Sequence, residues 1–427
     1  MVDVIKITLW GEELGALSWD NDKKFASFEF FSSFLSKNLD VSPIHMPIRS
    51  SVKKIYSFPR INEDTYKGLP GMLSDVLPDD FGNRLIDQWL VLNNIPKSKF
   101  TPLDRLCYIG TRGMGALEFQ PAKRIGQVQV NTLEVDKLAK LAEKILNTRE
   151  NLTLNLSDTE HLNELIKVGT SAGGQRAKAI IAYNSKTHEI RSGQAIAPEG
   201  FEHYMFKFDG VNDATLGDPK GYGRIEYAYY LMALDSGIDM EHSLLFEEHD
   251  RAHFMTKRFD RYHNQKIHMQ TLCSIAHFDY KSPGSYSYEN AFEVMRQMRL
   301  SHIDAIRLYK RMVFNVIARN QDDHTKNISF LMNKKGEWKL SPAYDVTYSY
   351  NPEGIWTSVH QMSVNGKRDD FVMKDLITIG EKISYKNCKE AIEQVIEVVS
   401  NWGMYAQKAG IPKLQADVLA KAFRLSL

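Results

Sequence analysis

Short runs rich in apolar and aromatic residues mark the first part of the chain and predict β-strands. Val4 to Trp10 and Leu14 to Trp19 flank the turn signal Gly11-Glu12-Glu13, so we expect a β-hairpin there. Phe25 to Phe31 is expected to form a third strand. Strands are also expected further along, at Ala179–Tyr183, His203–Phe208 and Phe254–Phe259.

Apolar residues that recur every three or four positions predict helices, most of them in the second half of the chain. Two are expected earlier, from Asp80 onward and over Val135 to Leu146. Thr101 to Gln120 is punctuated by glycines. The remaining helices are expected at Ile225–Gly237, at Ala391–Trp402 and at Leu414–Phe423, together with one buried helix that ends near Arg319.

This order of elements predicts an α+β fold with two lobes, in which a β-rich N-terminal lobe is followed by a mostly helical C-terminal lobe. A boundary is expected near residues 121–130. The chain has 427 residues, 43% of them hydrophobic and 25% charged, which is ordinary for a globular protein.

The charge balance argues against a direct nucleic-acid binder. Lys and Arg number 54 against 53 Asp and Glu, a net charge of +1, so no general positive field attracts phosphate backbones. The three cysteines are far apart and form no metal-like spacing, which is typical of a reducing compartment. We find no signal peptide and no stretch of about 20 apolar residues, so we expect a cytoplasmic protein without a membrane partner.

The segment from residue 316 to 348 carries the most chemistry. A buried helix is followed by the polar run Asn320 to Asn327, a predicted hairpin, and Ser341 to Asp345. The hairpin would bring Asp345 beside Asn327, and two such oxygen ligands can hold Mg²⁺. Asp322, five residues before Asn327, could take a proton from a hydroxyl. This is the layout of a kinase catalytic loop, D-x-x-x-x-N, followed by a metal-binding aspartate.

Two other interpretations fit parts of this segment. Its Asp and Asn residues could cap turns in a solvated loop, and a lone D-x-x-x-x-N match would favour that interpretation. A transition-metal hydrolase site could use Asp322, Asp323 and His324, but adjacent side chains point in different directions. The ordered set of helix end, loop, hairpin and aspartate favours the kinase.

A phosphate-binding loop is expected upstream, at Ser171 to Lys178. Its glycines would let backbone N–H groups approach anionic oxygens, although an ordinary turn is the alternative. Lys207 could neutralise phosphates from its strand, or simply extend its ammonium to solvent. Phe254 to Arg261 would connect the lobes and bind an adenine edge through its backbone, the alternative being an edge strand and a charged turn.

These residues resemble the HipA family of bacterial serine/threonine kinases, the toxins of toxin–antitoxin pairs. The resemblance covers nearly the whole chain and includes an S-x-x-G-x-x-x-K loop, an R-F-D-R hinge, a D-G-H-x-K-N catalytic loop and a P-x-Y-D metal segment. The matching segments here are Ser171–Lys178, Arg258–Arg261, Asp322–Asn327 and Pro342–Asp345. Asp323 departs from the family pattern, because glycine is common at that position.

The resemblance implies a kinase fold of three parts and a role for each matching residue. The parts are an N-terminal subdomain (1–125), the rest of the N-lobe with the ATP loop (126–256), and a helical C-lobe (257–427). Asp322 would be the catalytic base, Asn327 and Asp345 would bind Mg²⁺, and Ser171 would be autophosphorylated. ATP would contact Gly173, Gly174, Gln175, Arg176, Ala177, Lys178, Lys207, Lys257, Arg258, Phe259, His324, Lys326 and Tyr344.

The resemblance also implies partners. A small helix-turn-helix antitoxin, HipB-like, would carry the complex to operator DNA, and the substrate would be a translation component such as an aminoacyl-tRNA synthetase. Two other functions stay open at this stage: a small-molecule kinase, and a nucleotide-binding corepressor scaffold that acts with the antitoxin.

Overall fold

A computed structural model describes residues 2–121, 133–147, 161, 164–166, 168–169, 176–193, 196–211 and 221–427. The chain divides into two compact units. Unit 1 comprises Met1–Ser42, Met46–Gly223 and Ser243–Met269, and unit 2 comprises Pro43–His45, Arg224–His242 and Gln270–Leu427. The predicted boundary near residues 121–130 lies almost wholly outside the described residues.

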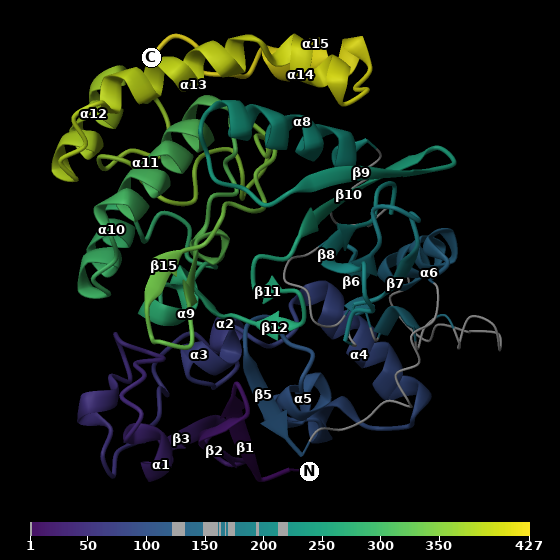
Figure 1. The fold of residues 1–427 in the computed structure, drawn as a ribbon, viewed down its shortest axis with the longest axis vertical. Coiled ribbons are helices and arrows are strands. Elements are labelled where there is room, and N and C mark those ends of the chain that lie inside the picture. Colours follow the sequence, from purple (N-terminus) through teal and green to yellow (C-terminus); the bar gives the residue numbers. More distant parts are fainter. Residues whose placement is uncertain are drawn as a thin grey trace. The chain divides into compact units, whose positions relative to one another are not determined.

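The first part of unit 1 is an antiparallel sheet with short helices (Figure 1). The sheet has the order β4-β3-β2-β1-β5, and β1 pairs on both sides, with β2 and β5. The strands are β1 Val4–Leu9, β2 Glu12–Asp20, β3 Phe25–Phe30, β4 Ile55–Tyr56 and β5 Leu117–Gln120. The helices are α1 Ser32–Leu35, α2 Glu63–Tyr66, α3 Gly71–Ser74, α4 Asp80–Leu92 and α5 Pro102–Ile109.

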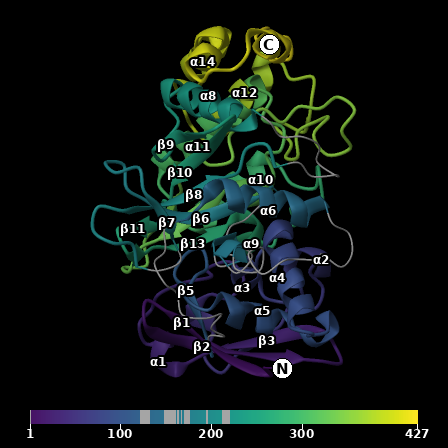
Figure 2. The same ribbon diagram turned by 90° about the vertical axis from the view of Figure 1, so that its right-hand side faces the viewer.

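The rest of unit 1 is a second antiparallel sheet, in the order β7-β6-β8-β10-β9, whose strands lie side by side in Figure 2. One apolar cluster joins this sheet to α4 and α6, and includes Leu85, Ile86, Leu138, Ala179 and Phe206. The elements are α6 Val135–Asn147, β6 Lys178–Tyr183, β7 Ile190–Ser192, β8 Glu202–Lys207, β9 Ser243–Glu248, β10 Arg251–Lys257, and the small hairpin β11 Arg261–Tyr262 and β12 Gln265–Lys266.

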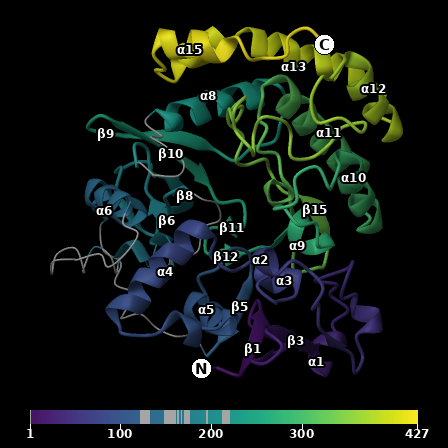
Figure 3. The ribbon, with the colours of Figure 1, turned by 180° about the vertical axis from the view of Figure 1, so that it is seen from behind.

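Unit 2 is mostly helical, and α11 packs against α10, α12 and α13 (Figure 3). The apolar face of α11, which includes Leu308, Met312 and Val316, is fully buried. The elements are α8 Tyr222–Asp235, which begins in unit 1, β13 His268–Thr271, which spans the division, α9 Leu272–Ala276, α10 Tyr288–Gln297, α11 His302–Ile317, β14 Ser329–Met332, β15 Trp338–Leu340, α12 Met373–Lys382, α13 Cys388–Ser400, α14 Trp402–Lys408 and α15 Lys413–Ala420.

The predicted α+β class, with a β-rich N-terminal region and a helical C-terminal part, is confirmed, and the predicted strands and helices occur with bounds shifted by a few residues. Helix α5 was not predicted, although its start signal is present in the sequence: Thr101 and Asp104 form a capping box and Pro102 occupies the first turn. No helix in the described part of the chain is both long and apolar enough to cross a membrane.

Candidate active site

The polar loop Asn320–Asn327 begins just after the C-terminal end of α11, where the backbone reverses direction. Arg319 has a left-handed backbone conformation (φ 57°), and the Asn320 N–H donates to the Asn315 carbonyl at 3.0 Å. This is one of the two bonds of a Schellman motif, which reverses the chain at the end of a helix. The Asn320 side chain repeats the link, since Nδ2 donates to Asn315 Oδ1 at 2.9 Å. The loop therefore leaves the helix in a fixed direction.

A single 3₁₀ turn, Thr325–Asn327, closes the loop. The Thr325 hydroxyl donates to the Phe278 carbonyl at 2.6 Å. Asn327 Nδ2 donates to the backbone carbonyl of Asp322 at 2.8 Å, so the two ends of the D-x-x-x-x-N sequence are tied to each other. This bond uses the amide nitrogen of Asn327, so the amide oxygen Oδ1 is left to act as an acceptor.

The hairpin of β14 and β15 returns the chain to this loop. Phe330 pairs with Leu340 and Met332 with Trp338. The Tyr344 hydroxyl then bonds to the Lys326 carbonyl at 2.6 Å and also to the Ser329 hydroxyl. These contacts join the segment after the hairpin to the residue just before Asn327.

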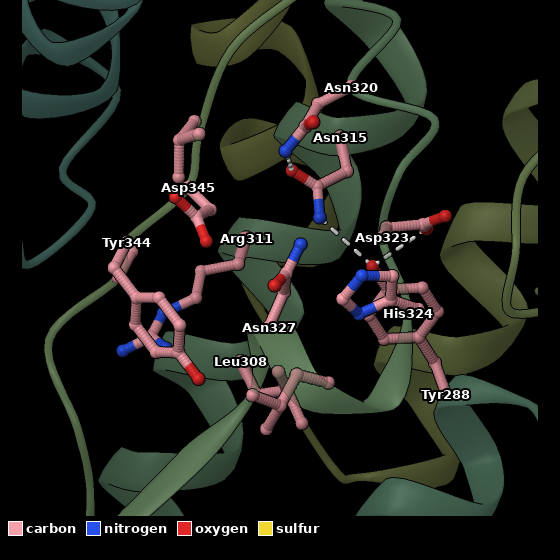
Figure 4. Close-up of a pocket in the computed structure, with 13 residues that line it drawn as sticks. Tyr288, Leu308, Arg311, Asn315, Asn320, Asp323, His324, Asn327, Tyr344 and Asp345 are labelled. Atoms are coloured by element: carbon pink, nitrogen blue, oxygen red, sulfur yellow. Dashed lines mark hydrogen bonds between the residues drawn. The ribbon is translucent and has the colours of Figure 1, made fainter. Parts of the chain in front are cut away.

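Asn327, Tyr344 and Asp345 line one small cavity, with His324 and Asp323 on its other side (Figure 4). Asp345 has a positive φ of 52°, a conformation that aspartate tolerates better than most residues. The cavity measures about 20 Å³, and every residue that lines it belongs to unit 2. It has room for an ion or a water molecule but not for a nucleotide.

The donor set of this cavity fits Mg²⁺. Asn327 offers an amide oxygen and Asp345 a carboxylate, and hard oxygen ligands in small number are typical of magnesium sites that complete their coordination with water and phosphate. No group of three or more His, Cys, Asp or Glu side chains arranged to hold a metal ion occurs among the described residues.

The Asp322 carboxyl group is accessible and has a raised pKa. Its side chain is 43% exposed, and the Trp356 indole Nε1–H donates to its Oδ1 at 2.7 Å. The surrounding protein displaces water and raises the pKa of Asp322, and the nearby carboxylates of Asp345 and Asp323 add to this effect. His324 and the Trp356 hydrogen bond act in the opposite direction.

Asp323, the departure from the family pattern, is almost fully buried at 3% exposure. Its Oδ1 accepts from the Gln361 backbone N–H at 2.8 Å, and its Oδ2 accepts from the Tyr288 hydroxyl and from His360 Nδ1, both at 2.9 Å. Both oxygens are thus engaged by donors of the protein. The Asp323 carboxylate serves as an internal anchor of the loop.

Arg311 is a cationic group that also lines the cavity. It is 5% exposed, it donates to the Ser341 carbonyl, and its Nε and Nη1 have no hydrogen-bond partner among the described residues. Burial lowers the pKa of Arg311 to about 10, so it remains a cation at neutral pH. Its positive charge lies beneath the Ser341–Asp345 segment.

Unit 1 holds most of the other expected site residues. Lys178 on β6 pairs with Lys207 on β8, which in turn pairs with Phe254 on β10. Residues directly opposite in an antiparallel sheet project from the same face, so the two lysines are cross-strand neighbours. The Lys207 ammonium lies 5.8 Å from the Phe254 ring centroid.

The R-F-D-R motif forms a buried ion cluster. Asp260 is fully buried and accepts from Arg258 Nε and Nη2 at 2.8 and 2.7 Å, and from Arg261 Nη1 at 2.7 Å. The Gly115 N–H also donates to Asp260 at 2.7 Å, and Arg261 donates to the carbonyls of Gly113 and Gly115. The Arg258 guanidinium is therefore engaged inside unit 1.

Gly115 is required at this cluster. Its φ is +72°, and a Cβ there would lie 3.0 Å from the Met269 backbone nitrogen. A side chain at residue 115 would crowd Met269, next to the loop that donates to Asp260.

The remaining expected site residues are placed as follows. Lys257 is ion-paired to Glu202, Arg176 lies 4.4 Å from the Tyr222 ring centroid, and Ala177 is buried. Phe259 is half-buried, and Lys326 lies 4.9 Å from the Tyr280 ring centroid. Ser171, Gly173, Gly174 and Gln175 lie outside the described residues.

Arg311, Trp356 and His360 were not expected to be site residues from the sequence. None of them belongs to a short motif that contains its partner: Trp356 is 34 positions from Asp322 and His360 is 37 positions from Asp323. Only the buried charge of Arg311, on the apolar face of a helix, could have been noticed in the sequence.

Comparison with known proteins identifies the family. The pattern of the HipA-like C-terminal domain matches residues 170–402, more than half of the chain, and that of the HipA N-terminal domain matches residues 5–120. The chain belongs to the HipA family. This confirms the resemblance found in the sequence, and the second match covers the first sheet of unit 1.

Similar proteins include a HipA chain from Shewanella oneidensis, solved in a toxin–antitoxin complex with HipB and its operator DNA. The likeness has a TM-score of 0.66 at 15% identity, and covers 98% of this chain and 94% of that one, so the two share a fold.

Two curated relatives are also similar in sequence. One, named "Putative kinase Y4mE", from Sinorhizobium fredii, is 28% identical over 22% of this chain. The other, named "Putative kinase", from Haemophilus influenzae, is 24% identical over 42% of this chain. The matches span 25% and 61% of the length of these two relatives.

Proposed function

We propose that this HipA-family chain is an ATP- and Mg²⁺-dependent serine/threonine protein kinase that acts as a growth-inhibiting toxin. The observation that carries the proposal is the loop of unit 2: Asp322 presents an accessible carboxyl group, while Asn327 and Asp345 line the cavity beside it. This arrangement matches the parts that phosphoryl transfer needs, a base and two metal ligands in a rigid loop.

Each of these residues has a simple task in the proposed reaction. Asp322 would orient a substrate hydroxyl and accept its proton, while Asn327 and Asp345 would hold Mg²⁺. When bound, the metal would neutralise charge on the β- and γ-phosphates of ATP. Catalysis would rest on alignment and charge stabilisation.

The paired lysines of unit 1 support nucleotide binding. Lys178 is 3% exposed and stands in register with Lys207, so the sheet concentrates positive charge at one point. A nucleotide phosphate would bind near these two ammonium groups, and the S-x-x-G-x-x-x-K loop that ends at Lys178 would supply backbone donors.

The partners follow from the family. The complex of the Shewanella protein with HipB and operator DNA supports a HipB-like helix-turn-helix antitoxin as partner here, with DNA contacted through the antitoxin. The proposed substrate is a protein of the translation machinery, such as an aminoacyl-tRNA synthetase. Ser171 is the proposed site of autophosphorylation.

Intact-mass spectrometry after incubation with Mg²⁺ and ATP tests the activity, followed by peptide mapping. We expect a gain of one phosphate at Ser171, reduced on the order of 10²–10⁴-fold in rate for Asp322→Asn, as for loss of a general base. ATP binding should persist in that variant. A chain that does not bind ATP would contradict the proposal, and one that binds ATP without transferring phosphate to itself or to a partner would instead be a scaffold.

A further inference from the structure

Asp322 is held on one side only. Trp356 Nε1–H donates to Oδ1 at 2.7 Å, and His324 Nε2 lies 3.8 Å from the same oxygen. No described residue donates a hydrogen bond to Oδ2. The two oxygens of this carboxylate therefore differ: Oδ1 accepts a hydrogen bond from an indole, whereas Oδ2 accepts none from a described residue, on a side chain that is 43% exposed.

Two buried glutamines fix the backbone carbonyls of Trp356 and of the next residue, Thr357. Gln361 Nε2 donates to the Trp356 carbonyl, and Gln321 Nε2 donates to the Thr357 carbonyl at 3.0 Å. Gln321 is fully buried and Gln361 is 3% exposed. Gln321 directly precedes Asp322 in the chain, so one buried network positions the indole and the carboxylate together.

Trp356 is set apart from its neighbour in this segment. Ile355 is fully exposed, whereas Trp356 is half-buried with its indole nitrogen directed at Asp322. A large aromatic side chain whose polar atom bonds to a reactive carboxylate has the geometry of an orienting group, the third member that aligns a catalytic base in many active sites.

We infer that Trp356 is a positioning residue for Asp322, and that it assigns Oδ2 as the oxygen that receives the substrate proton. The inference rests on the proposed kinase activity. In the transfer, the substrate hydroxyl oxygen forms a bond to the γ-phosphorus and the bond from that phosphorus to the β,γ-bridging oxygen breaks. The hydroxyl proton moves to Oδ2, and ADP leaves.

The test removes the indole N–H in two ways. Trp356→Phe removes the donor and part of the ring, and replacement of Trp356 by 3-benzothienylalanine removes the donor while keeping the shape. With MgATP and the full chain as its own phosphate acceptor, we expect both changes to lower kcat by about tenfold, as for a lost hydrogen bond to a charged group. The apparent KM for ATP should remain within about twofold, since the indole contacts the base and not the nucleotide.

Trp89→Phe is the matched control. Trp89 is also half-buried, packs on Phe100 and Tyr108, and belongs to unit 1, whereas Asp322 and Trp356 belong to unit 2. It should leave kcat and KM unchanged. If the benzothienyl protein retains the full rate, the donor has no role and the inference is overturned, even if Trp356→Phe is impaired by altered packing.

A double-mutant cycle separates action through Asp322 from a general effect. In an Asp322→Ala background the change Trp356→Phe should cause no further loss, because the group that it orients is absent. A further tenfold loss in that background would overturn the inference. If the unmodified chain transfers no phosphate, the proposed kinase function itself is contradicted. If the unmodified chain is active and the Trp356 variants have the same kcat, only the positioning role of Trp356 is refuted.

Discussion

Asp322 and Asp323 are adjacent in the chain but have opposite surroundings. The Asp322 side chain is 43% exposed, while both oxygens of Asp323 accept hydrogen bonds from buried groups. Asp323 and Asn327 therefore fix the loop through side-chain contacts on either side of His324. An accessible carboxylate between anchored neighbours is well suited to accept a proton, because it loses little freedom when a substrate binds.

At the residue scale, Asp345→Asn should weaken the response to Mg²⁺. Replacing the carboxylate removes the only charged ligand of the proposed pair and should raise the Mg²⁺ concentration for half-maximal autophosphorylation by roughly tenfold or more. A titration with Mg²⁺ at saturating ATP measures this. Asp370→Asn, an exposed aspartate outside the cavity, serves as control. An unchanged Mg²⁺ requirement would exclude Asp345 as a ligand.

At the element scale, the R-F-D-R segment ties the hairpin β11–β12 to the loop before β5. Burial alone would raise the pKa of Asp260, but Arg258 and Arg261 hold it well below its ordinary value. Lys266 adds a second tie, since its ammonium bonds to Glu118 at 2.7 Å. These contacts join the N-terminal sheet to the rest of unit 1 through buried charges.

This cluster predicts a pH dependence of stability. Because the folded pKa of Asp260 lies below the unfolded value of about 3.9, its contribution is complete above about pH 5 and is lost as the pH falls. Asp260→Asn should lower the free energy of unfolding by about 3–5 kcal/mol at neutral pH, and the difference from the unmodified chain should shrink toward pH 2. Urea unfolding over a pH series measures this.

The exposed residue Asp22 offers a control, since Asp22→Asn should change the free energy of unfolding little at any pH. A difference between Asp260→Asn and the unmodified chain that stays constant from pH 7 to about pH 2 would show that Asp260 is not charged in the folded protein.

A second set of contacts at the element scale connects the segment after α15 to the loop Asn320–Asn327. Arg424 donates to the Val316 carbonyl at 2.7 Å and to Gln321 Oε1 at 3.1 Å, and it is ion-paired to Asp369. It also lies 3.2 Å from His360 Nε2. Because a guanidinium can only donate, this nitrogen accepts, and Nδ1 of His360 carries the proton donated to Asp323.

Arg424→Ala should therefore loosen the loop Asn320–Asn327. We expect faster amide hydrogen exchange at residues 320–327 and an autophosphorylation rate lowered by about tenfold, because Asp369 and Gln321 lose a buried partner. Lys421→Ala, at a nearby exposed position, should change neither quantity. Unaltered exchange in the loop of the Arg424 variant would show that the segment after α15 does not support it.

At the scale of the whole molecule, the near-neutral charge bears on DNA binding. With a net charge of +1, the chain lacks the excess of cations that gives non-specific affinity for duplex DNA. We expect no change in fluorescence anisotropy when the chain alone is added to a labelled random-sequence duplex at physiological salt. Tight binding by the chain alone would contradict the proposal that DNA is reached through an antitoxin.

Much of the fold could be predicted from local sequence. The hairpin of β1 and β2, the helix α11 and the hairpin β14–β15 follow from periodicity and turn residues that lie within a few positions of one another. Helix α5 was missed because its glycine-rich surroundings concealed a capping box. The boundaries were the least accurate part, since helix and strand ends depend on contacts beyond the local pattern.

The sequence by itself determined most of the elements, the family and the order of Asp322, Asn327 and Asp345 along the chain, because these depend on residue type and short spacing. Only the tertiary structure decided what surrounds them. Trp356 reaches Asp322, and His360 reaches Asp323, from segments more than thirty positions away. Such contacts depend on how distant segments pack, and no periodicity or local motif specifies which side chains then meet.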